Sequence, residues 1–298
     1  MPKPLLEYTA ADWRRLRPLT QTVKSWRYRR CDMAYRRLGA VAGDLGAVAA
    51  SISNRKVLVT VAFCDPQILS WQLRLVRRYV PNAVHVIVDN STTDALAADN
   101  ARITAAAGAA YLRAPPNPWS GRSASRSHGI VLNWTWHNLI KPGRPEAFGF
   151  LDHDMLPTAA DDPFAALAHQ DLFGVVRTAG PRWFLWAGFC LFRFAGVEHL
   201  PLDFGQDWFL GLDTGGGNWT PLYSRMDRAS LRELRASWVP FKPGIAADDG
   251  PLMWCGTWVH EVGLAGDPGL VGQKRAALAR LLAPHLEDAA SPAAIGAA

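Results

Sequence analysis

Cysteine is scarce in this sequence, and segments that direct a chain into or across a membrane are missing from it. The four cysteines form no CxxC pair, which argues against a zinc knuckle and against a disulfide framework; they are Cys31, Cys64, Cys190 and Cys255. The first residues, MPKPLLEYTA, lack the basic-then-apolar pattern of a secretion signal. No uncharged apolar stretch reaches the length of about 18 residues that predicts a transmembrane helix. We therefore expect reduced thiols and a cytoplasmic protein.

Charged residues are also few, whereas apolar residues are plentiful. They make up 19% and 49% of the 298 residues, which excludes a chain disordered throughout. The length allows two domains of roughly 150 residues or one large α/β domain. The 32 Lys and Arg against 26 Asp and Glu leave a net charge of +6. This mild basic excess favours an acidic partner, without choosing between a sugar nucleotide, a lipid head group and nucleic acid.

The basic excess lies in residues 11–50, which carry nine Arg and Lys against three Asp. Apolar residues recur there at steps of three or four and predict a helix: Trp13, Leu16, Leu19, Val23 and Trp26. Two interpretations stay open. In one, the apolar stripe packs on the main domain and the basic face is solvated. In the other, the helix lies on an anionic membrane surface, at the inner face of the membrane. Nucleic-acid binding would rest on this segment alone, and we do not expect it.

The pattern changes at residue 56 to alternating strands and helices. VLVTVAF at 57–63 and VHVIV at 84–88 are apolar, β-branched runs typical of buried strands, and helical patterns follow at 66–80 and 94–107. This alternation predicts βαβ units and a mostly parallel sheet flanked by helices, an α/β fold. Further strands are expected at 148–151, 173–176 and 188–194, and further helices at 123–139 and 268–285. We predict a helical extension at 1–55, one α/β domain at 56–285 and a flexible tail at 286–298.

Polar residues follow the predicted strands. Asp152-His153-Asp154 leaves a buried strand at its carboxyl end, where open α/β sheets bind ligands. Carboxylates two residues apart can share a hard divalent cation that bridges phosphate oxygens. The alternative is a solvated turn in which an Asp caps a nearby helix.

Two further polar groups are candidates for ligand contacts. Asp89 and Asn90 end the second strand and can hydrogen-bond a base or a ribose, while Thr93 or Asp94 can cap the next helix. Arg122 and Arg126 lie four residues apart, hence on one helix face, and can meet a diphosphate or an acceptor anion. The alternative for the arginines is a solvated basic turn.

The order of these segments resembles the GT-A type glycosyltransferases, family 2-like in particular. The resemblance covers roughly residues 56–265 and rests on four motifs: VLVTVAF at 57–63, VIVDNSTTD at 86–94, RSHGI at 126–130 and FLDHDMLP at 150–157. It implies a GT-A fold, with a Rossmann-like nucleotide-binding sheet, and a nucleotide-sugar donor. Ser127 stands where the family usually has Asn, and Asn90 replaces one of a usual Asp pair. These departures concern the sugar and the base more than the fold.

The resemblance also implies roles for individual residues. Asp89 and Asn90 would contact the nucleoside, and Asp152 and Asp154 would address the donor diphosphate and a divalent metal, Mn²⁺ or Mg²⁺. Family members often take a further ligand from a C-terminal His, for which His260 is the candidate. An imidazole suits Mn²⁺ better than Mg²⁺, which prefers oxygen. The alternative for His260 is a half-buried structural His.

Inverting members of that family use a carboxylate to remove the proton of the acceptor hydroxyl. Asp213 and Asp207 compete for this role, and Asp213 is favoured because Asp-Thr-Gly could form a helix entrance with close substrate approach. The tryptophans of the second half can stack on sugars or pack in the core; they are Trp183, Trp186, Trp208, Trp219, Trp254 and Trp258.

The implied function is metal-dependent transfer of a sugar to a hydroxyl of a glycan, a lipid-linked acceptor or a small molecule. Two alternatives are a nucleotidyltransferase-like enzyme and a non-catalytic module that binds nucleotide-sugars. The first would normally have a Gly-rich loop after its first strand, where this chain has Phe63-Cys64-Asp65-Pro66.

Overall fold

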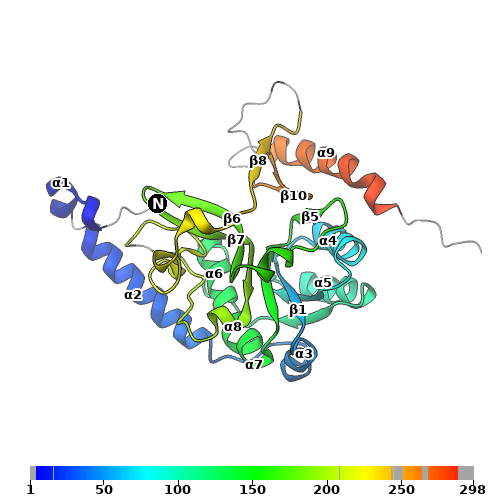
Figure 1. The fold of residues 1–298 in the computed structure, drawn as a ribbon, viewed down its shortest axis with the longest axis horizontal. Coiled ribbons are helices and arrows are strands. Elements are labelled where there is room, and N and C mark those ends of the chain that lie inside the picture. The colour runs from blue at the N-terminus through cyan, green and yellow to red at the C-terminus, as the bar shows by residue number, and fades with distance from the viewer. Residues whose placement is uncertain are drawn as a thin grey trace, which may run out of the picture.

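A six-stranded mixed sheet forms the centre of the molecule (Figure 1). The computed structural model describes residues 5–15, 17–207, 209–242, 244, 251–263 and 268–287. The strand order is β3-β2-β1-β4-β7-β6. The strands are β1 (Lys56–Ala62), β2 (Val84–Asp89), β3 (Ala110–Arg113), β4 (Ala147–Asp152), β6 (Leu172–Ala179) and β7 (Arg182–Arg193). The first four in this order run parallel, whereas β7 is antiparallel to both β4 and β6. The predicted α/β class with a mostly parallel sheet flanked by helices is therefore confirmed.

Both faces of the sheet are buried, which explains the continuous apolar run of β1. Val57 and Val59 point into one core layer, and Leu58 points into another. The first layer is closed by α6 (Ala124–Thr135) together with α2 (Arg17–Tyr35) and α3 (Leu45–Ser51). The opposite face is covered by α4 (Pro66–Tyr79) and α5 (Asp94–Ala106). The helix α4 starts with Asp65 as its cap and Pro66 in its first turn, both favoured at that place.

A second, antiparallel sheet with the order β5-β10-β9-β8 lies next to the carboxyl end of β4. Its strands are β5 (Met155–Pro157), β8 (Ala236–Val239), β9 (Leu252–Cys255) and β10 (Trp258–Glu261), and α9 (Pro268–Leu286) packs beside it. The shorter elements are α1 (Ala10–Arg14), α7 (Lys141–Gly143), α8 (Phe194–Val197), a π-helical turn at Trp136–Ile140, and 3-10 turns at Leu5–Glu7, Ala165–Ala168, Gly216–Asn218, Tyr223–Arg225 and Arg228–Ser230. No helix among the described residues is long and apolar enough to cross a membrane.

The predicted strands at 57–63, 84–88, 148–151 and 173–176 are confirmed with small shifts at their ends, as are the predicted helices from residue 66 onward. The strand predicted at 188–194 is also present, but it begins earlier, at Arg182. The sequence patterns missed β3, β5, β8, β9 and β10. These strands have three or four residues each, too few for an alternating pattern to stand out. The tail predicted at 286–298 lies outside the described residues from 288 onward.

The helix expected over 11–50 is wrong in its middle part. The chain leaves α2 after Tyr35 and becomes helical again only at Leu45, because Gly43 has φ +87° and its α-carbon lies against the sheet. A Cβ on Gly43 would lie 2.3 Å from the carbonyl oxygen of Tyr111. Pro18 does not break the helix, since it sits in the first turn of α2, where its missing N–H costs nothing.

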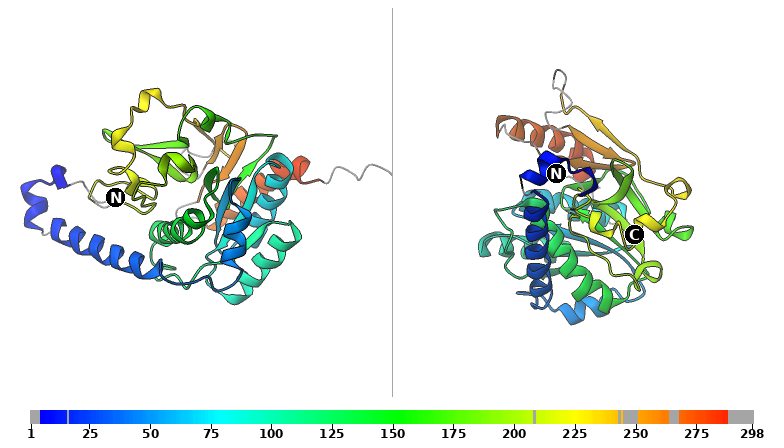
Figure 2. Two further views of the ribbon diagram at one scale, coloured as in Figure 1. Left: turned by 60° about the horizontal axis from the view of Figure 1, so that its bottom comes forward. Right: turned by 90° about the vertical axis from the view of Figure 1, so that its left-hand side faces the viewer.

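The apolar stripe of α2 faces solvent, so the interpretation that it packs on the main domain is wrong. The exposed fractions of Leu19, Val23 and Trp26 are 58%, 62% and 58%. The opposite face packs inward with polar and aromatic residues instead: Gln21, Ser25, Tyr28, Asp32 and Tyr35. Both figures show α1 and the beginning of α2 reaching beyond the body of the molecule (Figures 1 and 2). The domain limits at 55 and 285 stay a prediction, although Tyr28 and Tyr35 contribute to the main core.

Candidate functional site

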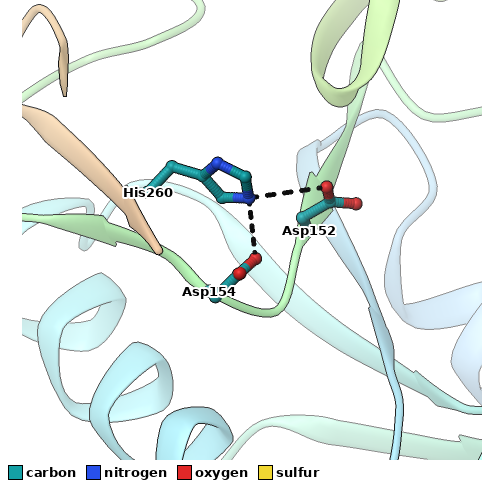
Figure 3. A group of neighbouring side chains, drawn as sticks. All are labelled: Asp152, Asp154 and His260. Atoms are coloured by element: carbon teal, nitrogen blue, oxygen red, sulfur yellow. Dashed lines mark ion pairs between the residues drawn. The ribbon is translucent and has the colours of Figure 1, made fainter. Parts of the chain in front are cut away.

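Asp152, Asp154 and His260 converge at the carboxyl end of β4 (Figure 3). Asp152 ends β4, Asp154 lies in the turn that follows, and His260 extends from β10. The Nε2 atom of His260 lies 3.1 Å from Oδ1 of Asp154 and 3.8 Å from Oδ2 of Asp152. One ligand atom from each side chain lies within 4.8 Å of the others. Two carboxylate oxygens and one imidazole nitrogen this close together can share one divalent cation, and this donor set fits Mn²⁺.

Two structural features bring His260 to the carboxylates. The β4–β5 turn passes the chain into the second sheet, where β5 pairs with β10 so that Met155 lies opposite His260. Arg275 of α9 then ties β10 to the start of α4, with its Nη2 atom 2.6 Å from Glu261 Oε2 and 2.7 Å from Asp65 Oδ2. Burial opposes the charge of Arg275, but these two carboxylates outweigh it and raise the pKa of the guanidinium.

Gln72 of α4 fixes the turn that carries the carboxylates. Its Nε2 atom donates to the carbonyl oxygens of Asp152 and Met155, at 2.7 and 2.9 Å. Its Oε1 accepts from the hydroxyl of Thr60, at 2.8 Å, and Thr60 also lies 3.0 Å from Nε2 of the buried His85. Burial lowers the pKa of His85 to about 4. Gln72 is not among the residues expected from the sequence, where it is marked only as an amide on the apolar face of a predicted helix.

His260 and Asp154 favour each other's charged forms, and Asp152 also favours the charged imidazole. Burial opposes the charge of Asp154, but His260 outweighs it and lowers the pKa of Asp154. Burial likewise opposes the charge of His260, but Asp154 and then Asp152 outweigh it and raise the pKa of the imidazole. Negative charge on two carboxylates therefore draws a cation to this place. His153, between them, takes another role: its Nδ1 accepts the backbone N–H of Phe63 at 3.0 Å.

The cluster lies in the wall of a cavity with a volume of about 700 Å³. Three of the five side chains predicted to bind a donor line it: Asn90, Arg122 and Asp152. Asn90 is held in place, since its Nδ2 donates to Ser127 Oγ at 3.1 Å and its Oδ1 accepts from Asn117 Nδ2 at 3.0 Å.

Asp89 and Arg126 do not line this cavity. The carboxylate of Asp89 is fully buried and accepts from the N–H of Ser91, from Asn100 Nδ2 and from the Tyr111 hydroxyl, at 2.9, 3.1 and 2.7 Å. The guanidinium of Arg126 lies over the ring of Trp119, 4.7 Å from its centroid. Both side chains thus lie outside the lining of the cavity.

The two candidates for the general base also lie outside the lining of this cavity. Asp213 Oδ1 accepts from Gln206 Nε2 and from the N–H of Thr214, both at 2.8 Å. Asp207 Oδ1 accepts the N–H groups of Phe209 and Leu210, and its side chain borders a separate small cavity beside α2. The expected helix entrance after Asp213 is a single 3-10 turn at Gly216–Asn218, preceded by Gly215 at φ 95°.

Three residues that line the cavity were missed as site residues. His128 lies with its Nδ1 3.6 Å from Oδ1 of Asp152. Arg177 and Trp238 come from β6 and β8. His128 belongs to the quoted RSHGI motif and could have been singled out, whereas nothing in the sequence places β8 beside β6. Of the tryptophans considered for sugar stacking, Trp186 lines the cavity, Trp183 and Trp258 are buried in the core, and Trp208 lies outside the described residues.

Comparisons with known proteins give only distant likenesses. No family model matches the sequence, and no curated protein matches it. Among solved structures, the galactosyltransferase LgtC with donor and acceptor sugar analogues is 16% identical, with a TM-score of 0.34; the match covers 46% of this chain and 57% of that one. The chain thus spans just over half of that galactosyltransferase.

Two other solved structures match over more of the chain. A mannosyltransferase from Pyrobaculum calidifontis, in complex with GDP-Man and Mn²⁺, is 14% identical with a TM-score of 0.43, over 91% of this chain and 73% of that one. Glucosyl-3-phosphoglycerate synthase from Mycobacterium tuberculosis, with Mn²⁺, UDP and glucosyl-3-phosphoglycerate, is 13% identical with a TM-score of 0.41; the match covers 83% of this chain and 85% of that one. Likenesses of this strength assign no activity, and the chemistry has to be argued from the residues of the site.

Proposed function

We propose that this protein is a metal-dependent glycosyltransferase, which moves a sugar from a nucleotide-sugar donor to a hydroxyl acceptor. The convergence of Asp152, Asp154 and His260 in the wall of a large cavity supports this proposal most directly. The cavity opens at the carboxyl end of the parallel strands, where open α/β sheets bind their ligands. Its volume of about 700 Å³ suits a ligand of nucleotide-sugar size.

Each side chain of the cavity then has a task. Asp152, Asp154 and His260 would hold Mn²⁺, or less favourably Mg²⁺, and the metal would offset the charge of the leaving diphosphate. Asn90 would contact the nucleoside, and Arg122 would meet the diphosphate. We infer that Asp89 and Arg126 act indirectly, by holding the end of β2 and Trp119 in place.

The transfer step proposed for this site is a direct displacement with inversion. The acceptor oxygen forms a bond to the anomeric carbon while the bond from that carbon to the diphosphate oxygen breaks, and the diphosphate leaves with the electron pair. The proton of the acceptor hydroxyl passes to a carboxylate, for which we favour Asp213 over Asp207. Asp213 lies close enough to the cavity residue Arg177 to favour the charged guanidinium, whereas Asp207 borders the cavity beside α2.

Release of nucleoside diphosphate tests this function. A panel of UDP- and GDP-sugars is incubated with the full chain and Mn²⁺, Mg²⁺ or EDTA. We expect release from one donor with Mn²⁺, less with Mg²⁺ and none with EDTA. Asp213→Asn should keep donor binding and lose transfer, with Asp207→Asn as the matched control that keeps both. Failure of every donor to bind or to turn over would contradict the proposal.

The alternatives are weighed by the same residues. A nucleotidyltransferase would use the loop after β1 for phosphate, but Asp65 in that loop caps α4 and pairs with Arg275. A non-catalytic module would bind a nucleotide-sugar without turnover, and the release experiment distinguishes this outcome from transfer.

We further propose that α2 brings the protein to an anionic membrane surface. Leu19, Val23 and Trp26 form an exposed apolar stripe on a helix that reaches beyond the body (Figure 2). Exposed basic residues surround the stripe: Lys24, Arg27, Arg29 and Arg30. An apolar face flanked by basic side chains is typical of helices that lie in the interface of anionic bilayers.

Sedimentation with lipid vesicles tests this contact. The protein should bind vesicles that contain phosphatidylglycerol and should bind pure phosphatidylcholine vesicles much less. Val23→Glu should weaken binding about fivefold or more, while Val271→Glu, at a similarly exposed valine of α9, should not change it. Absence of binding by the unmodified protein, or equal binding by the two variants, would contradict the proposal.

A further inference from the structure

The guanidinium of Arg177 is flanked by two indole rings and lies in the same cavity as the proposed metal ligands. The guanidinium carbon of Arg177 lies 5.3 Å from the ring centroid of Trp186 and 5.2 Å from that of Trp238. These residues come from β6, β7 and β8, so the central and the second sheet both contribute. All three side chains line the cavity. The fold thus builds this place from three separate strands.

The guanidinium of Arg177 is poorly satisfied by the described part of the chain. Within that part, no carboxylate lies at ion-pair distance from it, and its one hydrogen bond goes to Met253 Sδ at 3.3 Å. A thioether sulfur is a weak acceptor. Indole faces attract the charge but offer no oxygen to the N–H donors. The fork of Arg177 therefore presents donors to the cavity.

A comparison with Arg275 makes the point clearer. Arg275 is also half-buried, but two carboxylates occupy its fork. Burial lowers the pKa of Arg177, although Cys255 and Asp213 counteract it. A half-buried arginine whose fork has no carboxylate of its own chain can bind an anion by charge-assisted hydrogen bonds.

The donor and the acceptor could each supply that anion, and the position of Arg177 favours the acceptor. The diphosphate of a donor would lie at the metal held by Asp152, Asp154 and His260. The ring of Trp186 contacts His260, with ring centroids 4.9 Å apart, and the guanidinium of Arg177 lies over the same ring. Trp186 thus stands between Arg177 and the proposed metal ligand His260. A favourable electrostatic interaction also links Arg177 to Asp213, the favoured general base.

We propose that Arg177, flanked by Trp186 and Trp238, binds a carboxylate or phosphate group of the acceptor. The acceptor is then an anionic hydroxy compound. This inference rests on the glycosyl transfer proposed above. The guanidinium fork holds the anion by parallel N–H bonds, and the indoles fix the plane of the fork. The hydroxyl of the acceptor is thereby directed toward the metal-bound donor.

Calorimetry with the full chain separates the two anion sources. UDP or GDP with Mn²⁺ serves as the donor probe. In the nucleotide-saturated complex, glycerol 3-phosphate and glycerate serve as anionic acceptor probes, and glycerol serves as the neutral one. We expect an anionic probe to bind and glycerol not to bind. Arg177→Met should weaken the anionic probe about tenfold or more and change nucleotide binding less than twofold.

Two further variants keep the test sharp. Arg102→Met removes an exposed arginine of α5 and should change neither binding reaction. Trp238→Ala removes a half-exposed flank of the guanidinium and should weaken the anionic probe severalfold, which remains measurable if Arg177→Met does not fold. Equal anion binding by Arg177→Met and the unmodified protein, or equal loss of nucleotide and anion, would overturn the inference. Absence of nucleotide binding would instead overturn the proposed function.

Discussion

Two pairs of buried or half-buried carboxylates in this molecule have different partners. Asp152 and Asp154 meet an imidazole in the wall of a cavity. Asp32 and Asp203 meet the amide of Asn133 between α2 and α6, where Asn133 Nδ2 donates to both, at 3.0 and 2.8 Å. The second pair is also bound by protein donors, because Asp32 pairs with Arg36 and Asp203 accepts the N–H of Gly205.

This difference separates a ligand site from a structural contact. We call the contact of Asp32 and Asp203 with Asn133 the joint. In the joint, amide, guanidinium and backbone donors bind the carboxylates, and these contacts attach α2 to the main domain. The cavity pair keeps oxygen atoms directed at a common point. Carboxylates close together therefore do not by themselves indicate a metal site; the donors that surround them decide.

The largest expected effect is on the cavity pair. Asp154→Ala removes a proposed metal ligand and should weaken Mn²⁺-dependent nucleotide binding about 100-fold or more, measured by calorimetry. Because Asp154 pairs with His260, the stability of the fold should fall as well, and urea denaturation checks that the variant is folded under the binding conditions. Asp162→Ala, at an exposed carboxylate paired with Lys56, is the matched control. Unchanged Mn²⁺-dependent binding in Asp154→Ala would remove the distinction between the two pairs.

The joint should respond in the opposite way. Asn133→Leu leaves two carboxylates without their shared donor and the N–H of Phe204 without its acceptor. The free energy of unfolding should fall by about 3 kcal/mol, measured by urea denaturation, while the folded fraction keeps its Mn²⁺-dependent binding. Thr135→Val, on the same helix, should be nearly neutral because the described residues give its hydroxyl no hydrogen-bond partner. Equal stability of the two variants would show that Asn133 does not hold the joint.

The pH dependence gives a smaller effect that isolates Asp32. Burial raises the pKa of Asp32 from 3.8 to about 6. Between these values the folded chain binds a proton that the unfolded chain does not, so this group stabilises the fold at low pH and loses its contribution as the pH rises through 6. His85 acts oppositely, because its lowered pKa, about 4, makes stability rise between pH 4 and 6.5.

A difference between two stability curves separates these contributions. Asp32→Asn should gain about 2–3 kcal/mol relative to the unmodified protein between pH 4 and 7. Urea denaturation of both proteins over that range measures the difference, to which His85 contributes equally in both. A difference that does not vary with pH would contradict the raised pKa of Asp32.

Much of the site could be predicted from the sequence. The strand before Asp152 and the polar residues after it are adjacent in the chain, so a local pattern reports them. His260 was reached only through the family resemblance, because its place depends on a pairing between two short strands. Arg177 and Trp238 meet through two sheets, and no local pattern reports that contact.

The sequence also fails to predict which face of α2 packs inward, and the reason is a different one. Periodicity locates an apolar stripe, and burying that stripe is the usual outcome. Here Tyr28, Asp32 and Tyr35 pack inward. Asn133, which donates to Asp32, lies 101 residues further along the chain, and Pro115, whose carbonyl accepts from the Tyr35 hydroxyl, lies 80 residues further. The sequence pattern does not show which surface of the main domain packs against a helix.

The most direct test of the metal centre is a crystal structure of the protein with Mn²⁺ and a nucleoside diphosphate, with anomalous diffraction from manganese. We expect one manganese peak bound by Asp152, Asp154 and His260, with diphosphate oxygens completing its coordination. A manganese peak elsewhere, or a nucleotide bound in the cavity without metal at these three side chains, would contradict this expectation.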